Sequence, residues 1–280
     1  MKAIDLHVHS TYSDGTLTPN ELVTRAKQFG LSSIALTDHD TIEGVEEAVN
    51  AGLENDLEII PGVELSTEYM GKEIHIVGLF IDYTDENFKK ELENLRNTRD
   101  NRNILLCKRF QDAGFDISYE EMLELYPDAV LTRAHFADIL MKKGYVKSRN
   151  EAFDRYIGDR CPFYIKREKM EPATAIELIH NVSGVAILAH PVLYHLGKEQ
   201  MNKLMDYLCA NGIDGLEAIY STYTLGDELE MKRIAKEHNL LISGGSDYHG
   251  GNKPDIEIGK GRGKLFVPYE ILEKLRTVIK

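Results

Sequence analysis

Short apolar runs alternate with amphipathic segments of helical spacing through about the first eighty residues, and again through about the last hundred. The first runs are AIDLHV, SSIALTDHD, LEIIPGVEL and KEIHIVGLF, and the later ones are SGVAILAHP, DGLEAIY and LLISGGSDYH. Strands that alternate with helices are typical of parallel βα units. The seven strand candidates are one fewer than the usual eight of a β/α barrel. The pattern therefore predicts an α/β fold of the barrel type.

The segment TPNELVTRAKQFG carries the boundary signals of a complete helix. Thr18 is a suitable N-cap, Pro19 fits the first helical position, and Glu21 completes a capping box with Thr18. Gly30 follows the last apolar position and favours the end of the helix there. The first strand is thus predicted to lead directly into a helix.

Between residues 84 and 172 the strand pattern disappears. Apolar residues at helical spacing predict one long helix over 86–113 and shorter helices over 118–125, 132–143 and 148–157. The stretch contains no Gly/Ser-rich or Pro-rich linker that would let it move freely. We therefore predict a barrel domain made of residues 1–83 and 173–280, interrupted by a helical insertion over 84–172 that serves as a substrate-binding cap.

Polar residues that can bind metal or transfer protons gather where the predicted strands end. His7 and His9 lie two apart on the first strand, so they share one face of the sheet, and Asp14 follows in the next loop. In a parallel barrel the site is built from the carboxyl ends of the strands. The residues predicted to meet at this rim are His7, His9, Asp14, His39, Glu64, His75, His190, Asp247 and His249.

A single histidine on a strand is more often a hydrogen-bonded core residue than a ligand. Six imidazoles and three carboxylates at strand ends are a different case, because crowded carboxylates repel and buried imidazoles need partners. Divalent cations meet both needs. The mixed nitrogen and oxygen ligands suit manganese, zinc or iron better than calcium, and nine groups suffice for two to three ions.

The overall composition limits the partners. With 33 Lys and Arg against 46 Asp and Glu, the formal charge is −13, which argues against a surface that holds long nucleic acids. The three cysteines have no C-x-x-C spacing, so neither a disulfide framework nor a thiolate zinc site is expected. No signal-peptide pattern or apolar stretch of membrane-spanning length is visible, and we expect a cytoplasmic protein with no membrane association. The sequence leaves the oligomeric state open.

Six short motifs follow one another along the chain, and their order resembles that of the PHP (polymerase and histidinol phosphatase) family of metal-dependent phosphoesterases. They are H-x-H, T-D-H-D, G-x-E, E-I-H, A-H-P and S-D-x-H. The resemblance covers the whole chain and implies a distorted seven-stranded β/α barrel of the TIM type. It implies that one ion is held by His7, His9, Glu64 and Asp247. Glu64 would bridge to a second ion on His75 and His190, and a third would be held by Asp14, His39 and His249.

Metal ions at such a site lower the pKa of a shared water and neutralise a phosphoryl group, so phosphate ester hydrolysis is the expected reaction. We place Glu64, Asp247 and His249 in the catalytic group. The acid that protonates the leaving group is left open. Asp40 and Tyr248 stand next to metal ligands in the sequence, although Asp40 can equally serve to orient His39.

The helical insertion resembles that of a stand-alone branch containing 3′,5′-bisphosphonucleotide phosphatases and 5′→3′ exonucleases. Its T-R-x-H motif implies phosphate contacts from Arg133 and His135, and its re-entry segment implies one from Arg167. A solvated basic face is the alternative, and we favour it for Arg160 and Lys166. Two positions depart from the family pattern: Ala134 replaces a proline, and Asp159 with Arg160 interrupts a glycine-rich stretch.

The resulting functional prediction is a phosphatase for 3′,5′-bisphosphonucleotides, releasing the nucleoside 5′-monophosphate, or an enzyme that trims short 5′-phosphorylated oligonucleotides. One alternative is a histidinol-phosphate phosphatase, which the long helical insertion argues against. A second is a non-catalytic metal-binding module, which would be expected to lack some ligands. Here all nine ligand positions are filled.

Overall fold

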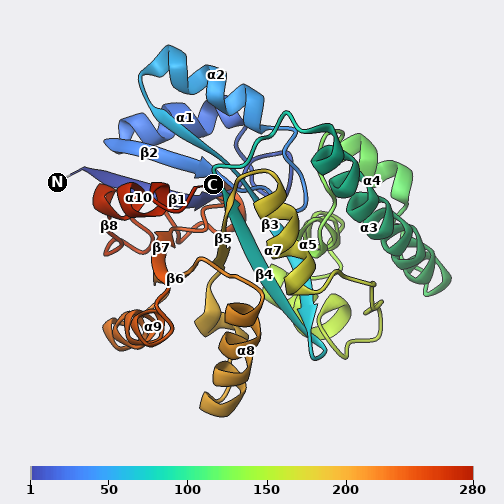
Figure 1. The fold of residues 1–280 in the computed structure, drawn as a ribbon. Helices are drawn as coiled ribbons and strands as arrows, with labels where there is room; N and C mark the ends of the chain where they lie inside the picture. Colours follow the sequence, from blue (N-terminus) through green and yellow to red (C-terminus); the bar gives the residue numbers. More distant parts are fainter. Residues whose placement is uncertain (1, 280) are drawn as a thin grey trace.

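The computed structural model describes residues 2–279, which fold around one mixed β-sheet with helices packed outside it (Figure 1). The strands follow the order β7-β6-β5-β4-β3-β2-β1-β8 across the sheet. They are β1 (Ala3–Val8), β2 (Leu31–Leu36), β3 (Glu58–Tyr69), β4 (Lys72–Leu79), β5 (Val185–Leu188), β6 (Gly215–Tyr220), β7 (Leu241–Gly245) and β8 (Val267–Pro268).

The sheet curls into a nearly closed barrel because its two ends meet at the end of β1. The amide of Asp247 donates to the carbonyl of His7 at 2.9 Å, and the amide of His9 donates to the carbonyl of Tyr248 at 3.0 Å. The seven predicted strands are all present, and the α/β barrel class is confirmed. The eighth strand, β8, is a two-residue segment antiparallel to β1 that was not among the strand candidates.

The prediction of an all-parallel barrel is wrong for β4, which runs antiparallel to both β3 and β5. Met70 and Gly71 form the turn between β3 and β4, with φ of 49° and 78°. Two central residues at positive φ build a tight hairpin turn, which can only join antiparallel strands. Glu64 was expected at the end of its strand and instead lies in the middle of the twelve-residue β3. His75 still reaches the rim, since it lies in the first half of the reversed strand.

The α-helices are α1 (Pro19–Gln28), α2 (Val45–Asn55), α3 (Glu86–Asp112), α4 (Tyr119–Leu125), α5 (Arg133–Lys142), α6 (Arg149–Ala152), α7 (Pro172–Asn181), α8 (Lys198–Ala210), α9 (Leu225–Glu237) and α10 (Tyr269–Arg276). The capping box predicted for the first helix is present in α1, where Thr18 and Glu21 exchange hydrogen bonds. Helices α3 to α6 lie together to one side of the sheet (Figure 1), and a π-helical turn over Phe153–Ile157 follows α6.

Three buried apolar clusters hold these elements. The largest joins the strands to α1, α2, α7, α8 and α9, and a second joins β1 and β5 to α10. The third lies within the helical segment, where the stacked rings of Phe110 and Phe163 have centroids 4.2 Å apart. The helices of residues 86–157 thus have an apolar core of their own, and their other side is free to face the barrel rim.

Candidate metal centre

All nine residues predicted as metal ligands come together at one rim of the barrel. Side-chain nitrogen and oxygen atoms within 4.8 Å of one another form four overlapping groups. They comprise His9, Asp14, His39 and His249; His7, Glu64 and His190; His7, His9 and Asp247; and His39, Glu64 and His75. These groups overlap more than the three separate ligand sets implied by the family resemblance, so the assignment of ligands to individual ions stays a prediction.

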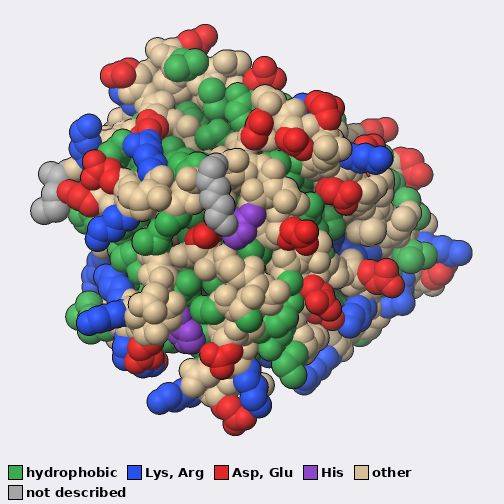
Figure 2. Space-filling view, viewed as in Figure 1, with side chains coloured by type: hydrophobic (Ala, Val, Ile, Leu, Met, Phe, Trp, Pro, Cys, Tyr) green, Lys and Arg blue, Asp and Glu red, His purple; other side chains and the backbone are tan. Residues whose placement is uncertain are grey.

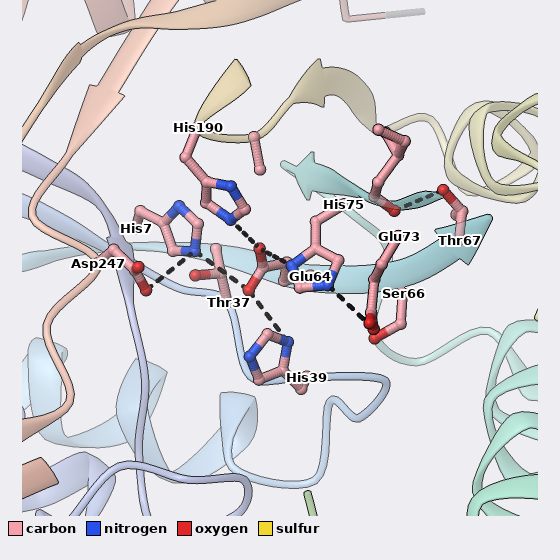
Figure 3. Close-up of polar contacts among 12 residues, drawn as sticks. His7, Thr37, His39, Glu64, Ser66, Thr67, Glu73, His75, His190 and Asp247 are labelled. Carbon is pink, nitrogen blue, oxygen red and sulfur yellow. Dashed lines mark hydrogen bonds and ion pairs between the residues drawn. The ribbon is translucent and has the colours of Figure 1, made fainter. Parts of the chain in front are cut away.

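Glu64 lies at the centre of the cluster, and imidazole rings from several strands turn toward its carboxylate (Figure 3). Its Oε1 is 2.8 Å from Nδ1 of His75 and 2.9 Å from Nε2 of His190. Its Oε2 is 3.0 Å from Nδ1 of His39 and 3.3 Å from Nε2 of His7. The two oxygens of Glu64 thus face different imidazoles, and both would be available to hold metal ions.

Asp247 and Asp14 continue the cluster on the side of His249. Asp247 Oδ1 is 3.3 Å from Nε2 of His9 and 3.3 Å from Nδ1 of His249. Asp14 Oδ1 is 3.2 Å from Nε2 of His249. The loop after β1 that carries Asp14 is fixed by buried Asp38, which accepts from the backbone amide of Ser10 at 2.8 Å. Imidazole rings thus lie between the carboxylates, with His249 between Asp247 and Asp14 and His39 between Asp14 and Glu64.

The residues fit divalent metal ions, and the hydrogen bonding of their buried atoms supports this. Glu64 Oε2 and Asp14 Oδ1 are buried, and among residues 2–279 neither has a hydrogen-bond partner of good geometry, although ring nitrogens lie close. Nε2 of His7 and Nε2 of His9 face each other at 3.1 Å. Nitrogen and oxygen lone pairs that converge without hydrogen-bond geometry are the arrangement that a cation satisfies.

The protein charges also favour cations at the rim. Burial raises the pKa of the Glu64 carboxyl, but the imidazoles of His39, His75 and His7 outweigh it and hold that pKa well below its usual range. Burial lowers the pKa of His75, and the neighbouring Glu64 carboxylate reverses this and raises it to about 10. The ionised Glu64 therefore favours a positive charge on its neighbours, which either a proton or a metal ion can supply.

Buried groups behind the cluster fix the orientation of the candidate ligands. Glu217, on β6, accepts from Nδ1 of His7 at 2.9 Å, so Nε2 of that ring is left to face the cluster. The hydroxyl of Tyr194 accepts from the amide of His75 at 2.9 Å and donates to the carbonyl of Ala189 at 2.7 Å. Such outer contacts set the tautomer and direction of metal-binding imidazoles.

Two candidate ligands have a strained backbone. His190 has a φ of 29° and Asp247 a φ of 55°, and neither is a glycine. Positive φ costs energy in residues with a Cβ and persists only where the surroundings impose it. Each lies two residues beyond the end of a strand, β5 for His190 and β7 for Asp247, where the unusual backbone turns the side chain into the cluster.

A cavity of about 300 Å³ opens beside the cluster, between the barrel rim and the helical segment. Its barrel side includes Asp14, His39, His75 and His190. The opposite side supplies five basic side chains, which are Arg99, Arg102, Arg133, Arg167 and Lys169. Of the predicted phosphate contacts, Arg133 and Arg167 thus line the cavity.

Arg99 and Arg102, on α3, were missed by sequence reasoning. They are three apart on one helix face and only 6% and 8% exposed, so both guanidinium groups are buried. Burial and the nearby charges of Arg99 and Arg167 lower the pKa of Arg102 to about 9. The spacing R-x-x-R in a helix that otherwise exposes its charges was the signal available in the sequence.

Asp40 faces these arginines, and its carboxylate accepts hydrogen bonds from Ser66 and Arg99 rather than from His39, so the expectation that Asp40 orients His39 finds no support. Its carboxylate forms a buried ion pair with Arg99 and lies 3.6 Å from Arg167. It also accepts from the amide of Ser66 at 2.7 Å. Asp40 therefore ties the arginines of the cavity to the barrel.

His135, the third predicted phosphate contact, does not line this cavity. It is 2% exposed, and its Nδ1 accepts from the amide of Thr132 at 2.9 Å in the capping box of α5. The hydroxyl of Thr132 in turn donates to Oδ2 of Asp14 at 3.0 Å. In this structure the histidine of the T-R-x-H motif fixes the start of α5 and, through Thr132, the position of Asp14.

Metal-binding groups beside a basic cavity are what a metal-dependent hydrolase of phosphate esters requires, and this is the class of protein that the fold and site define. Sequence comparison gives the family, since the PHP domain matches residues 5–158. The chain belongs to the PHP family and is a metal-dependent phosphoesterase.

Relatives with known names cover nearly the whole chain. A 5′-3′ exoribonuclease from Haemophilus influenzae is 40% identical over 89% of this chain and 90% of its own length. A 3′,5′-nucleoside bisphosphate phosphatase from Chromobacterium violaceum is 31% identical over 92% and 91%. A solved amidohydrolase from Chromobacterium violaceum, with bound sulfate and no metal, superposes with a TM-score of 0.88 at 30% identity, covering 99% of this chain and 97% of its own.

The charged side chains on one face of the molecule are mixed in sign. Figure 2 shows basic and acidic side chains interspersed on the face drawn, rather than a continuous basic surface. A continuous basic surface is what binding along a nucleic-acid backbone requires. Within residues 2–279, no helix combines the length and the apolar character needed to cross a membrane.

Proposed function

We propose that the chain hydrolyses the 3′-phosphate of 3′,5′-bisphosphonucleotides, or trims short 5′-phosphorylated oligonucleotides by the same chemistry. The observation that carries this proposal is one cavity with two places for an anion. The first is the cluster around Glu64, and the second is formed by Arg99, Arg102 and Arg167 on the opposite wall. A substrate with two phosphates can occupy both places at once.

Two to three divalent ions of manganese, zinc or iron are proposed at the rim, held by the nine residues named above. When bound, they supply a water of lowered pKa and neutralise charge on the phosphoryl group. The protein supplies the orientation, since Glu64 and Asp247 fix the imidazoles around them. Helices α3 and α5 close the cavity from the other side, which supports the proposal that residues 84–172 act as a substrate-binding cap.

The distal phosphate is proposed to bind to the buried arginines. Arg102 lines the cavity, and its guanidinium group forms no hydrogen bond or ion pair with residues 2–279, so its donors are available for a ligand. Guanidinium groups match phosphate in geometry and charge. The activity named for the bisphosphate phosphatase relative fits a nucleotide with phosphate at both the 3′ and the 5′ position, and that of the exoribonuclease relative fits the oligonucleotide alternative.

The alternatives are less well supported. Histidinol phosphate carries one phosphate and a cationic amine, and an amine would be repelled by the arginine wall. A non-catalytic metal-binding module would need neither the second anion site nor a complete ligand set. Here all nine candidate ligands converge beside the cavity.

The experiment compares phosphate release from adenosine 3′,5′-bisphosphate, a 5′-phosphorylated trinucleotide and histidinol phosphate after manganese reconstitution. We expect the nucleotides to be preferred, and Arg102→Gln to raise their KM about tenfold or more while p-nitrophenyl phosphate is hydrolysed as before. Lys166→Gln is the matched control, since this exposed lysine pairs with Glu68 outside the cavity. Preference for histidinol phosphate, or no effect of Arg102→Gln on nucleotides, would refute the proposal.

A further inference from the structure

The five basic residues of the cavity differ in how far they are neutralised by the protein. Arg99, Arg102 and Arg167 form what we call the inner arginine cluster, and Asp40 is the carboxylate that pairs with it. Three positive charges against one leave a net charge of two. A phosphate monoester dianion carries the opposite charge and so balances the inner arginine cluster.

The two remaining cations that line the cavity, Arg133 and Lys169, are already engaged. Oε2 of Glu73 accepts from Nη2 of Arg133 at 3.0 Å and forms an ion pair with Nζ of Lys169 at 2.8 Å. Nη1 of Arg133 also pairs with Asp159 at 2.8 Å. The carboxylates of Glu73 and Asp159 therefore neutralise these two cations. Asp159 occupies one of the positions where this chain departs from the glycine-rich family pattern.

Glu73 is held where it is by the β3-β4 hairpin. It lies on β4 opposite Glu68, whose carboxylate binds Lys166, and two residues before His75. Its side chain lines the cavity and is 29% exposed, and Oε1 lies 3.5 Å from Nε2 of His75. The carboxylate of Glu73 thus contacts Arg133 and Lys169 on one side and His75 of the candidate metal cluster on the other. The pairing of β4 with β3 holds its backbone in this position.

We propose that Glu73 is a specificity-determining residue that limits the distal group of the substrate to a single phosphate. This inference rests on the proposed function. A nucleotide with a diphosphate at the distal end carries an additional negative charge beyond what the inner arginine cluster balances. The other cations that line the cavity are Arg133 and Lys169, and both already share Glu73, so the second phosphate meets a carboxylate instead of free donors.

The test compares adenosine 3′,5′-bisphosphate with adenosine 3′-phosphate 5′-diphosphate, using wild type and Glu73→Gln with manganese. Repulsion between like charges about 4 Å apart in a partly screened site raises the free energy of binding enough to weaken affinity about tenfold or more. We expect wild type to prefer the bisphosphate by at least that factor in kcat/KM. Glu73→Gln should reduce the preference several-fold, chiefly by lowering KM for the diphosphate.

Two variants control for charge and for folding. Asp159→Asn releases the same Arg133 but leaves Glu73 in place, and it should keep most of the preference. Glu73→Asp keeps the charge and should keep the preference, and it serves as the folded comparison if Glu73→Gln is unstable. An equal effect of Asp159→Asn and Glu73→Gln, or no preference in wild type, would overturn the role assigned to Glu73.

Both nucleotides are also measured as inhibitors of p-nitrophenyl phosphate hydrolysis. The ratio of their inhibition constants reports the same discrimination even if neither nucleotide is hydrolysed. Absence of nucleotide hydrolysis would count against the proposed function. An inhibition ratio that is unchanged between wild type and Glu73→Gln would count against the specificity role, so the two failures are distinguishable.

Discussion

Oε1 of Glu217 lies 2.9 Å from Nδ1 of His7, and both side chains are almost fully buried. The other oxygen of Glu217 accepts from the backbone amide of His190 at 2.7 Å. One carboxylate on β6 therefore fixes the ring of one candidate ligand and the backbone of another. Because a carboxylate on Nδ1 leaves Nε2 unprotonated and more basic, Glu217 prepares His7 for metal binding without touching the metal itself.

Glu217→Gln is expected to weaken metal affinity by roughly 10- to 100-fold while leaving the barrel folded. A glutamine side chain has only one acceptor oxygen, so it cannot accept from both Nδ1 of His7 and the backbone amide of His190 as the carboxylate does. Activity should recover at high manganese concentration. Metal titration followed by activity and by bound-metal analysis measures the shift. Glu58→Gln is the control, because Glu58 pairs with Arg276 away from the rim. Equal metal affinity in wild type and Glu217→Gln would contradict this role.

Removal of metal should destabilise the fold as well as abolish activity. Ligands that bind only the folded state add stability, by roughly 3 to 4 kcal/mol when free metal exceeds Kd by 100- to 1,000-fold. Dialysis against EDTA should lower the free energy of urea unfolding by about this amount. His9→Ala should be inactive and folded, and EDTA should affect its stability less, because His9 contacts both Glu64 and Asp247. A chelator effect equal to that in wild type would exclude His9 as a ligand.

The candidate ligands could be found from the sequence because each lies within a recognisable strand or in the loop that follows one. Position along a strand was harder to predict. Glu64 was expected at a strand end, and the Met70-Gly71 turn instead extends β3 into a hairpin. Methionine is not a residue that signals a turn at positive φ, so the hairpin had no clear sequence signature.

The side of the cavity away from the metal cluster was harder to predict from the sequence. Arg99, Arg102, Glu73 and Lys169 come from three separate elements, and their proximity depends on how α3 packs against the barrel. A charged side chain on an amphipathic helix is normally predicted to be exposed to solvent. His135 shows the converse, since a motif residue expected at the phosphate proves to cap a helix.

Arg99 and Arg102 are expected to affect stability in opposite directions. Arg99→Gln removes the closest ionic partner of the buried Asp40 and should cost up to about 3 to 5 kcal/mol, because the carboxylate keeps only the more distant Arg167. Arg102→Gln removes a buried charge repelled by its neighbours and should leave stability unchanged or raise it by about 1 kcal/mol or more. Urea unfolding of both variants gives the comparison.

Lys108→Gln, exposed on the same helix, controls for the loss of a helical cation. If Arg99→Gln and Arg102→Gln were equally destabilising, Arg102 would have a structural partner and would not be free to bind a ligand. That result would also weaken the assignment of the inner arginine cluster as the distal phosphate site.

His135 should make stability depend on pH. Burial lowers its pKa from 6.5 to about 4, so the fold favours the neutral ring. Since the folded-state pKa lies below the unfolded one, the stability present above pH 6.5 is lost as the pH falls toward 4. Between pH 7 and pH 5 this single group should cost about 2 kcal/mol.

His135→Gln isolates the effect, because glutamine at this helix position can still accept from the amide of Thr132 but does not titrate. Urea unfolding at pH 7 and pH 5, with EDTA in all samples so that metal release does not contribute, gives the pH dependence of each protein. Wild type should lose about 2 kcal/mol more than His135→Gln over this interval. If both proteins lost the same free energy of unfolding between pH 7 and pH 5, the His135 ring would have an ordinary pKa. His135 would then not be buried at the start of α5 in solution.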